Sequence, residues 1–199
     1  MILLHCATGN AGKLGEFRLA ARAFSAGPPV AIELLPGFQE LPPCVETGAT
    51  FEENAAIKAR HYGRYAPGLL FADDSGLEVD ALAGAPGVYS ARFSGPQATA
   101  ESNNRLLLEK LRGVRNRAAH FVCALALVEG ARTLGVWRGT VEGVILDEPR
   151  GTGGFGYDPL FYCPALGCTF GEAGEEQKLS VSHRGRAMRE MLAALAADT

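Results

Sequence analysis

The sequence lacks the features that mark fibrous, membrane-spanning and disulfide-stapled proteins. Its longest uninterrupted apolar run, Phe121 to Val128, is far shorter than the roughly 20 residues that cross a bilayer. The five cysteines are odd in number and include no Cys-x-x-Cys pair, so we expect neither a disulfide framework nor a zinc site. Internal repeats and low-complexity tracts are also missing, which leaves an ordinary globular chain.

Neither sign of charge is in excess. Lys and Arg number 19 against 22 Asp and Glu, a net charge of -3, so nothing favours bulk attraction to nucleic acid or to an anionic membrane. A polyanionic ligand would have to be met by a local cluster of cations. Ile2 to Leu4 is followed at once by His5 and a polar loop, which is not the pattern of a secretory signal. We therefore expect a cytoplasmic protein that binds neither nucleic acid nor membrane.

A hydrophobic content of 47% in 199 residues is enough to form a sizeable core, and we expect a single domain over residues 1–199. Hydrophobic spacing and turn residues predict strands interspersed with helices. The predicted strands are 2–7, 30–35, 69–72, 118–128 and 132–146, the last two paired antiparallel; the predicted helices are 13–24, 50–65, 100–111 and 184–197. Residues 77–95 are predicted to be mostly loop.

A glycine-containing turn, Thr8 to Lys13, joins the first predicted strand to the first predicted helix. Free amides and the helix dipole make a helix N-terminus favourable for phosphate, and Lys13 adds a full positive charge. The turn is not a Walker A loop, because Ala7 and Leu14 stand where that motif has glycine and Ser or Thr. An ordinary strand-to-helix turn is the simpler alternative.

Two carboxylates, Asp73 and Asp74, follow the apolar run 69–72 and begin a predicted polar turn that ends at Gly76. Adjacent strand residues point to opposite faces, so we expect one carboxylate to enter a cleft and the other to brace the turn. An acidic residue at such a position can hold Mg²⁺ or accept a proton from water. An Asx turn without a catalytic role is the alternative.

A third carboxylate, Glu46, precedes a helix that the capping box Thr50 to Glu53 opens. On that helix Asn54, Lys58 and His61 share one side. A lysine near carboxylates and a phosphate loop is well placed to neutralise a triphosphate. The alternative is a polar helix face exposed to solvent.

A group of donors, Lys178 and Ser182 to Arg186, stands before the last predicted helix. Histidine and arginine side chains can donate hydrogen bonds to a carbonyl or to the edge of a base. Phe155, in a glycine-dense stretch, is suited to stacking on a base. The alternatives are a Ser182 helix cap with solvated arginines, and a phenylalanine of the core.

Taken together, these residues resemble the inosine triphosphate pyrophosphatase family, also known as Ham1-like proteins. Six blocks occur in the family's order and span nearly the whole chain, so the resemblance is specific. The matching blocks are Ala7 to Lys13, Glu46 to Ala55, Ala72 to Asp80, Gly84 to Arg92, Gly151 to Pro159, and Ser182 to Gly185.

The resemblance implies an elongated, mixed α/β sheet with flanking helices, two lobes around a central cleft, and a homodimer. It implies Mg²⁺-dependent hydrolysis of ITP, dITP and XTP to the monophosphate and pyrophosphate, which removes deaminated purines from the nucleotide pool. Glu46 and Asp74 would hold Mg²⁺, and Asp74 and Lys58 would be catalytic. The implied substrate-binding residues are Thr8, Gly9, Asn10, Ala11, Gly12, Lys13, Ser75, Phe155, Gly156, Tyr157, Asp158, Lys178, His183 and Arg184.

Four other readings of the sequence are weaker. A Maf-like pyrophosphatase for modified pyrimidine or methylated nucleotides is disfavoured by the block Ser182 to Arg184, and a nucleotide sensor without turnover would not need Glu46 and Asp74. A serine hydrolase is disfavoured because no Gly-x-Ser-x-Gly elbow exists. A nucleic-acid binder is disfavoured by the overall charge, although the arginines near residues 112–117 and 184–189 could form a local patch.

Overall fold

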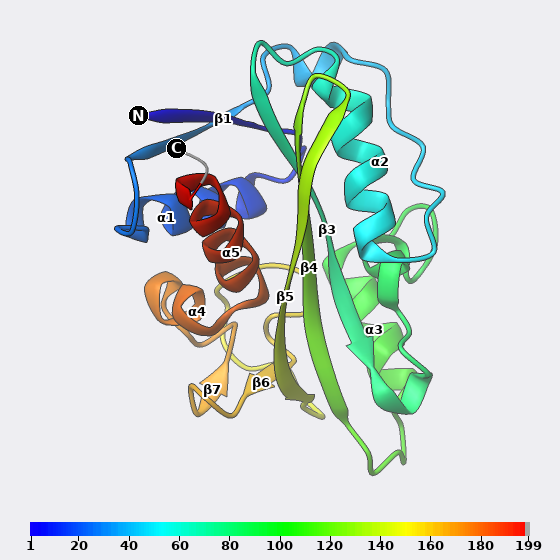
Figure 1. The fold of residues 1–199 in the computed structure, drawn as a ribbon. Coiled ribbons are helices and arrows are strands. Elements are labelled where there is room, and N and C mark those ends of the chain that lie inside the picture. The colour runs from blue at the N-terminus through cyan, green and yellow to red at the C-terminus, as the bar shows by residue number, and fades with distance from the viewer. Residues whose placement is uncertain (198–199) are drawn as a thin grey trace. The chain divides into compact units, whose positions relative to one another are not determined.

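The computed structural model describes residues 1–197 and contains a seven-stranded sheet in the order β2-β1-β3-β4-β5-β6-β7, with helices flanking it (Figure 1). This confirms the predicted mixed α/β class. The strands are β1 (Ile2–Cys6), β2 (Val30–Leu34), β3 (Leu69–Val79), β4 (Ala118–Glu129), β5 (Arg132–Ile145), β6 (Phe161–Cys163) and β7 (Cys168–Thr169); the α-helices are α1 (Ala11–Ala23), α2 (Phe51–Gly63), α3 (Ala100–Lys110), α4 (Glu175–Val181) and α5 (His183–Ala197); the short 3-10 helices are η1 (Phe38–Glu40), η2 (Asp80–Leu82) and η3 (Gly87–Arg92).

The chain divides into two compact units. The first comprises residues 1–74, 123–139 and the C-terminal segment from His183, and the second comprises residues 75–122 and 140–182. Strands β3, β4 and β5 each contribute residues to both units. That the whole chain is a single domain, and that a central cleft separates two lobes, stay predictions.

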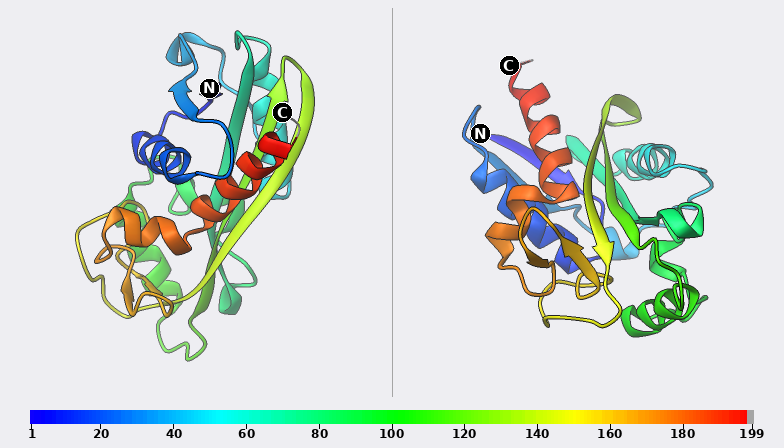
Figure 2. Two further views of the ribbon diagram at one scale, coloured as in Figure 1. Left: turned by 60° about the vertical axis from the view of Figure 1, so that its left-hand side comes forward. Right: turned by 90° about the horizontal axis from the view of Figure 1, so that it is seen from below.

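The first unit is built on parallel strands. β1 pairs with β2 from Ile2↔Val30 to Cys6↔Leu34, and on its other side with β3 at Cys6↔Phe71. Parallel strands end at the same edge of a sheet, so the loop after β1 comes close to the carboxylates that follow Phe71 in β3. Helix α1 packs on β2 and on α5, as Figures 1 and 2 show, and the Phe17 ring meets Phe71 edge to face at 5.3 Å.

The second unit has an aromatic core. The rings of Phe121, Phe161 and Phe170 lie 4.5 to 5.9 Å apart, and Tyr157 is buried with them. Offset and tilted ring pairs of this kind stabilise a core beyond the area they bury. The glycine-dense segment 150–156, which precedes Tyr157 in the chain, has no regular secondary structure.

Most local predictions are confirmed. The capping box opens α2: the Thr50 side chain accepts from the Glu53 amide, and the Glu53 carboxylate accepts from the Thr50 amide. The two long strands β4 and β5 are neighbours in the sheet and are joined by a tight turn at Gly130, which requires an antiparallel pair. Helices α1, α3 and α5 lie where hydrophobic spacing predicted them.

The prediction of a polar turn at Asp73 to Gly76 is wrong. These residues lie inside β3, which runs from Leu69 to Val79 instead of ending at residue 72. The strand continues because both buried carboxylates find hydrogen-bond donors from other parts of the chain, and the amide of Leu77 donates to the Ser90 hydroxyl at 2.9 Å. Helix α4 was not predicted, and α2 ends at Gly63, slightly before the predicted end.

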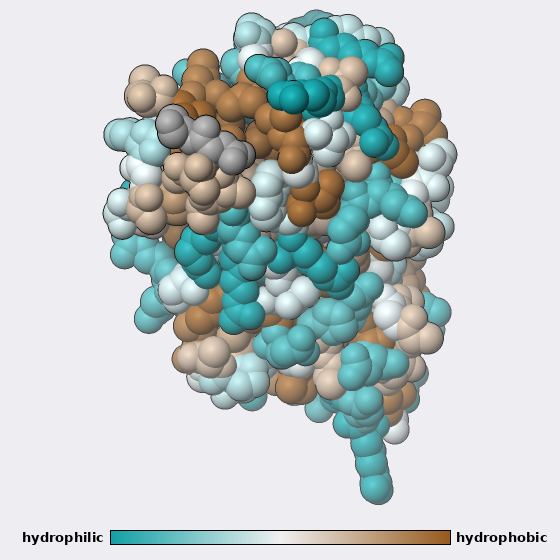
Figure 3. Space-filling model, in the orientation of Figure 1, coloured by the Kyte–Doolittle hydropathy of each residue, from teal (hydrophilic) through white to brown (hydrophobic). Residues whose placement is uncertain are grey.

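Hydrophilic and hydrophobic residues are unevenly distributed over the face of the molecule seen in Figure 3. On the face in Figure 3, hydrophilic residues predominate and hydrophobic ones gather in limited areas. Among residues 1–197 no helix is both long and apolar enough to span a membrane. All five cysteines are free thiols, and Cys6, Cys123 and Cys163 are buried as part of the core.

Candidate active site

The turn after β1 has the geometry of an anion site in the first unit. Asn10 caps α1, its side-chain oxygen accepting from the Lys13 amide at 3.0 Å, while the Thr8 hydroxyl accepts from the Asn10 amide at 3.2 Å. The first turn of α1 contains no acidic side chain, so its amides and the positive end of the helix dipole are not neutralised locally. The structure thus places Thr8 to Lys13 at a helix N-terminus, as predicted.

Asp73 contacts two lysines: Lys13, at the end of this turn, and Lys58, on α2. The Lys13 ammonium lies 2.7 Å from the Asp73 carboxylate, and Lys58 donates to the Asp73 backbone carbonyl at 2.9 Å. Burial disfavours the charged form of Asp73, but the cations of Lys13, Lys58 and Arg184 outweigh it and hold the pKa of this carboxyl well below its usual range. Asp73 therefore braces cationic groups, and not the turn that one of the two adjacent carboxylates was predicted to brace.

Asp74 faces a different set of partners on α2. Its carboxylate accepts from the Asn54 amide at 3.1 Å, and the Asn54 carbonyl oxygen accepts from the Gly48 amide at 2.8 Å. Asn54 therefore connects Asp74 to the loop that carries Glu46. Burial, together with the nearby negative charge of Glu46, raises the pKa of Asp74 to about 6, against the opposing effects of Lys58 and Asn54.

Lys58 lies between the carboxylates. Its ammonium is 3.2 Å from the Glu46 carboxylate, and although burial opposes the charge, Asp73, Glu46 and Asp74 raise the pKa of Lys58 above its ordinary value. The polar side of α2 is consequently turned toward the carboxylates and is not a solvent-exposed face. The structure brings together three predicted residues, Glu46, Lys58 and Asp74.

This donor set fits a magnesium ion. Within residues 1–197 no group of three or more His, Cys, Asp or Glu side chains is arranged to hold a metal. Mg²⁺ does not need one, because it is usually held by one or two carboxylates and completes its shell with water and substrate phosphates. Glu46 and Asp74 offer two hard oxygen ligands beside cations suited to phosphate, with Asp74 buried and Glu46 partly exposed.

The other residues predicted to bind substrate lie in two places, and all of them except Ser75 were predicted to form the pocket for the base. The second unit contains Ser75 in β3, the loop Phe155 to Asp158, and Lys178 in α4. His183 and Arg184 begin α5 in the first unit. In each group, hydrogen bonds and ion pairs hold polar side chains in place.

Asp158 organises the loop of the second unit. Its carboxylate accepts from the Phe155 amide at 2.8 Å and from the Lys178 ammonium at 2.6 Å. The Lys178 ammonium also lies 5.0 Å from the centre of the Phe155 ring and 5.3 Å from that of Phe170. The Tyr157 hydroxyl donates inward to the Ser90 carbonyl at 2.8 Å, and burial raises the pKa of Tyr157.

Arg184 is fixed by a residue that the sequence did not single out. Its guanidinium donates to the Glu16 carboxylate of α1 at 2.9 Å, and both groups are largely buried. Burial opposes the charge of Arg184, but Glu16, together with Cys123 and Asp73, outweighs it and raises the pKa of the guanidinium. His183 is fully buried, and the β5 backbone approaches it so closely at Gly139 that a side chain there would collide with the His183 carbonyl.

Three residues that support the site were not predicted to bind substrate or metal: Asp73 and Asn54, which the sequence had singled out without such a role, and Glu16, which it had not. Asn54 had a detectable signal, because it lies one helical turn before Lys58 on the same side of α2. The pairing of Glu16 with Arg184 had none, since these residues are 168 positions apart in the chain.

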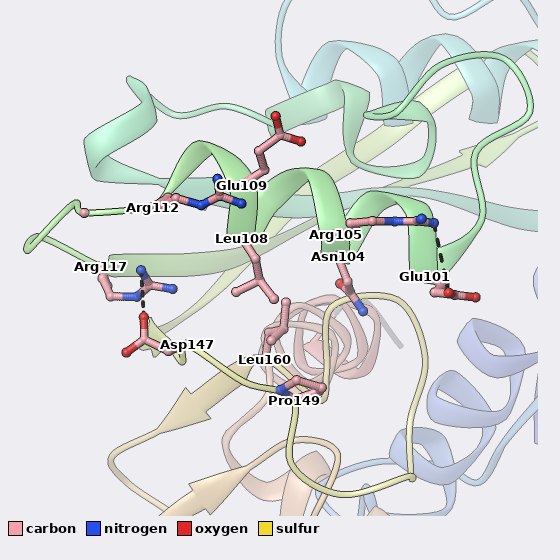
Figure 4. Close-up of a pocket in the computed structure, with 11 residues that line it drawn as sticks. Glu101, Asn104, Arg105, Leu108, Glu109, Arg112, Arg117, Asp147, Pro149 and Leu160 are labelled. Atoms are coloured by element: carbon pink, nitrogen blue, oxygen red, sulfur yellow. Dashed lines mark ion pairs between the residues drawn. The ribbon is translucent and has the colours of Figure 1, made fainter.

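The second unit also contains a cavity of about 720 Å³ along α3, shown in Figure 4. Leu108, Leu160 and Pro149 line it, and ion pairs between Arg105 and Glu101 and between Arg117 and Asp147 stand around it. None of the predicted site residues lines this cavity. The carboxylates and lysines of the first unit are a better candidate for catalysis, because they form ion pairs and shift each other's pKa values.

Comparison with known proteins gives a consistent result. The chain is 50% identical over 187 residues to the dITP/XTP pyrophosphatase of Exiguobacterium sp. strain AT1b, covering 93% of this chain and 92% of that protein. It is 46% identical to the Escherichia coli O157:H7 protein of the same name, covering 95% of each. The solved structure of the Staphylococcus aureus Ham1 protein aligns with a TM-score of 0.85 at 37% identity, covering 99% of this chain and 100% of that one.

A second solved structure, of a HAM1 protein from Coxiella burnetii, aligns over the whole of both chains with a TM-score of 0.84 and 38% identity. The sequence profile of the Ham1 family matches residues 4–194, almost the full length of the chain. The resemblance found in the sequence is thereby confirmed, and the chain belongs to the Ham1 family.

Proposed function

We propose that this protein is a nucleoside triphosphate pyrophosphatase that hydrolyses ITP, dITP and XTP to the monophosphate and pyrophosphate. The proposal is carried by one observation: Glu46, Asp74 and Lys58 converge in the first unit, where Lys13 at the N-terminus of α1 pairs with the neighbouring Asp73. The dITP/XTP pyrophosphatase relatives, about half identical over nearly the whole chain, support the substrate class.

The triphosphate would bind to cations and amides of the first unit. The free amides at the start of α1 and the ammonium groups of Lys13 and Lys58 would neutralise the phosphate oxygens. Mg²⁺, held by Glu46 and Asp74, would supply electrostatic stabilisation to the reacting phosphoryl group. Magnesium dependence is part of the proposal.

Asp74 would accept the proton of the attacking water. A general base works best when its pKa is close to the operating pH, and burial raises the pKa of Asp74 to about 6. Asn54 holds the carboxylate in place by donating to one of its oxygens. The water would attack the α-phosphorus, and pyrophosphate would leave.

The base would be recognised by donors. Hypoxanthine and xanthine carry a carbonyl oxygen at position 6, where adenine carries an amino group. Donors from His183, Arg184 and backbone amides therefore match the former and would face another donor in adenine, a mismatch that hydrogen-bonding sites reject strongly. Phe155 would stack on the ring and contribute affinity for any purine.

The test is pyrophosphate release from ITP, XTP, ATP, GTP and dTTP with Mg²⁺, alongside an EDTA control and Asp74→Asn. The proposal requires release from ITP and XTP that EDTA and the variant abolish, with little from ATP. Nucleotide binding without release would favour a sensor, and release from dTTP alone would favour the Maf-like alternative. A homodimer is expected from the family resemblance, and light scattering distinguishes one chain from two. A cytoplasmic location is also part of the proposal.

A further inference from the structure

A single side chain of α3 holds the backbone of the predicted base loop. The Asn104 amide donates to the Gly156 carbonyl at 3.0 Å. Asn104 and Leu108 project from the same side of α3, one helical turn apart (Figure 4). Both residues belong to the second unit, as does the loop Phe155 to Asp158.

This hydrogen bond restrains the loop at a point where its backbone could otherwise change conformation. Gly156 has φ of +62°, a left-handed conformation that glycine adopts and leaves easily. A peptide unit is planar, so holding the Gly156 carbonyl also fixes the direction of the Tyr157 amide in the same plane. Other contacts of the loop involve other atoms, among them the Tyr157 hydroxyl on Ser90, the Asp158 carboxylate on the Phe155 amide and on Lys178, and the Asp158 amide on the Phe155 carbonyl.

The contribution of Asn104 to the stability of the fold does not explain its presence at this position. Within residues 1–197 its side-chain oxygen is buried with no hydrogen-bond partner, which costs stability. Replacing the residue with alanine removes this unsatisfied oxygen together with the bond to Gly156, so the two effects on folding oppose each other. Stability alone therefore does not account for Asn104, which points to a role in the function of the loop that it holds.

We propose that Asn104 is a positioning residue for nucleobase binding, which it serves by fixing the peptide between Gly156 and Tyr157. This inference rests on the function proposed above. It makes a prediction that a structural role would not: the contribution of the base to binding should fall, while the contribution of the triphosphate should not.

The experiment compares Asn104→Ala and Asn104→Asp with Leu108→Ala. Asp is nearly isosteric with Asn but turns an acceptor toward the Gly156 carbonyl. Leu108 packs against the core of the second unit without a bond to the loop, so its truncation reports loss of packing alone. For each protein we would measure kcat and KM for ITP, inhibition of ITP hydrolysis by inorganic tripolyphosphate, which has no base, and the thermal midpoint.

We expect Asn104→Ala to raise KM for ITP about tenfold, the effect of losing roughly one restraining hydrogen bond, with kcat within about threefold. Asn104→Asp should raise KM further, and neither variant should change the tripolyphosphate inhibition constant. Leu108→Ala should lower the thermal midpoint and leave KM unchanged. An unchanged KM in both Asn104 variants, or parallel losses for ITP and tripolyphosphate, would overturn the inference.

If the wild-type protein releases no pyrophosphate, the proposed function has failed, and calorimetric binding of ITP then decides the role of Asn104. Weaker ITP binding in Asn104→Ala, with tripolyphosphate binding unchanged, would support that role. Equal ITP binding by both proteins, or none by the wild type, would overturn it.

Discussion

The Lys13 ammonium lies 2.7 Å from the Asp73 carboxylate, so the cation at the N-terminus of α1 is held by the strand that also carries Asp74. Adjacent residues of β3 thereby serve two different groups, because successive side chains of a strand point to opposite faces. Asp73 balances lysines, whereas Asp74 faces Asn54 and lies near Glu46. The first three predictions follow from this difference.

Asp74→Asn should abolish turnover and increase stability at neutral pH. Removing a general base that is also a metal ligand should lower kcat at least about a thousandfold. The folded pKa of Asp74, about 6, is above its unfolded value, so the ionised carboxylate destabilises the fold above pH 6. Asparagine avoids this, and the variant should be more stable by about 1–3 kcal/mol at pH 8, with the difference vanishing below pH 4. Denaturant unfolding at both pH values measures it, and near-normal activity would remove Asp74 from the reaction.

Asp73→Asn should have the opposite effect on stability. The folded pKa of Asp73 lies below the unfolded one, so its contribution is fully present above about pH 4 and is lost only as the pH falls through the depressed folded value. The variant leaves Lys13 without its partner and should lose about 3 kcal/mol at pH 7.5. Equal stability of Asp73→Asn and wild type in urea would contradict this account.

Magnesium affinity should depend on pH. A protonated Asp74 cannot serve as a ligand, and its pKa without metal is about 6. The Mg²⁺ concentration that gives half-maximal activity should therefore rise about tenfold for each unit of pH below 6 and change little between pH 7 and 8. Titrations of activity with Mg²⁺ at pH 5 and 7.5 measure it. A half-maximal concentration independent of pH over this range would exclude Asp74 as a ligand.

Arg184→Ala should reduce the preference for ITP over ATP. A guanidinium is a planar donor set that a lysine ammonium cannot reproduce, so Arg184→Lys should reduce the preference as well. Both variants disturb the pair with Glu16 and should lose stability. The ratio of kcat/KM for ITP to that for ATP does not depend on the folded fraction, so it separates the two effects. An unchanged ratio would remove Arg184 from base recognition.

Signals that act over a few residues were sufficient for most helices and strands. The capping box at Thr50, the turn with Lys13 at its end, and the hairpin at Gly130 were all predicted from neighbouring residues. They could be predicted because capping, turn formation and hydrophobic periodicity are local interactions. The grouping of Lys58 with Asn54 on one side of α2 follows from helical spacing alone.

The course of the chain at Asp73 and Asp74 could not be predicted in this way. Two acidic residues before Ser75 and Gly76 have the composition of a turn, yet β3 continues through them. What overrides the local preference is hydrogen bonding by Lys13 and Asn54, one of them 60 positions away. The partnership of Arg184 with Glu16, and the hold of Asn104 on Gly156, are equally long-range.

The sequence by itself determined the class of fold, the family, and which carboxylates, lysines and donors are available for chemistry, because these follow from residue types at short spacings. Only the tertiary structure decided how the acidic residues divide their work, since the pKa of a carboxylate depends on its burial and on the charges beside it. Asp73 and Asp74 are the same residue type at consecutive positions. Burial and the charges that the fold brings beside each carboxylate make one an anion that braces cations and the other a carboxylate whose pKa of about 6 suits it to exchange a proton.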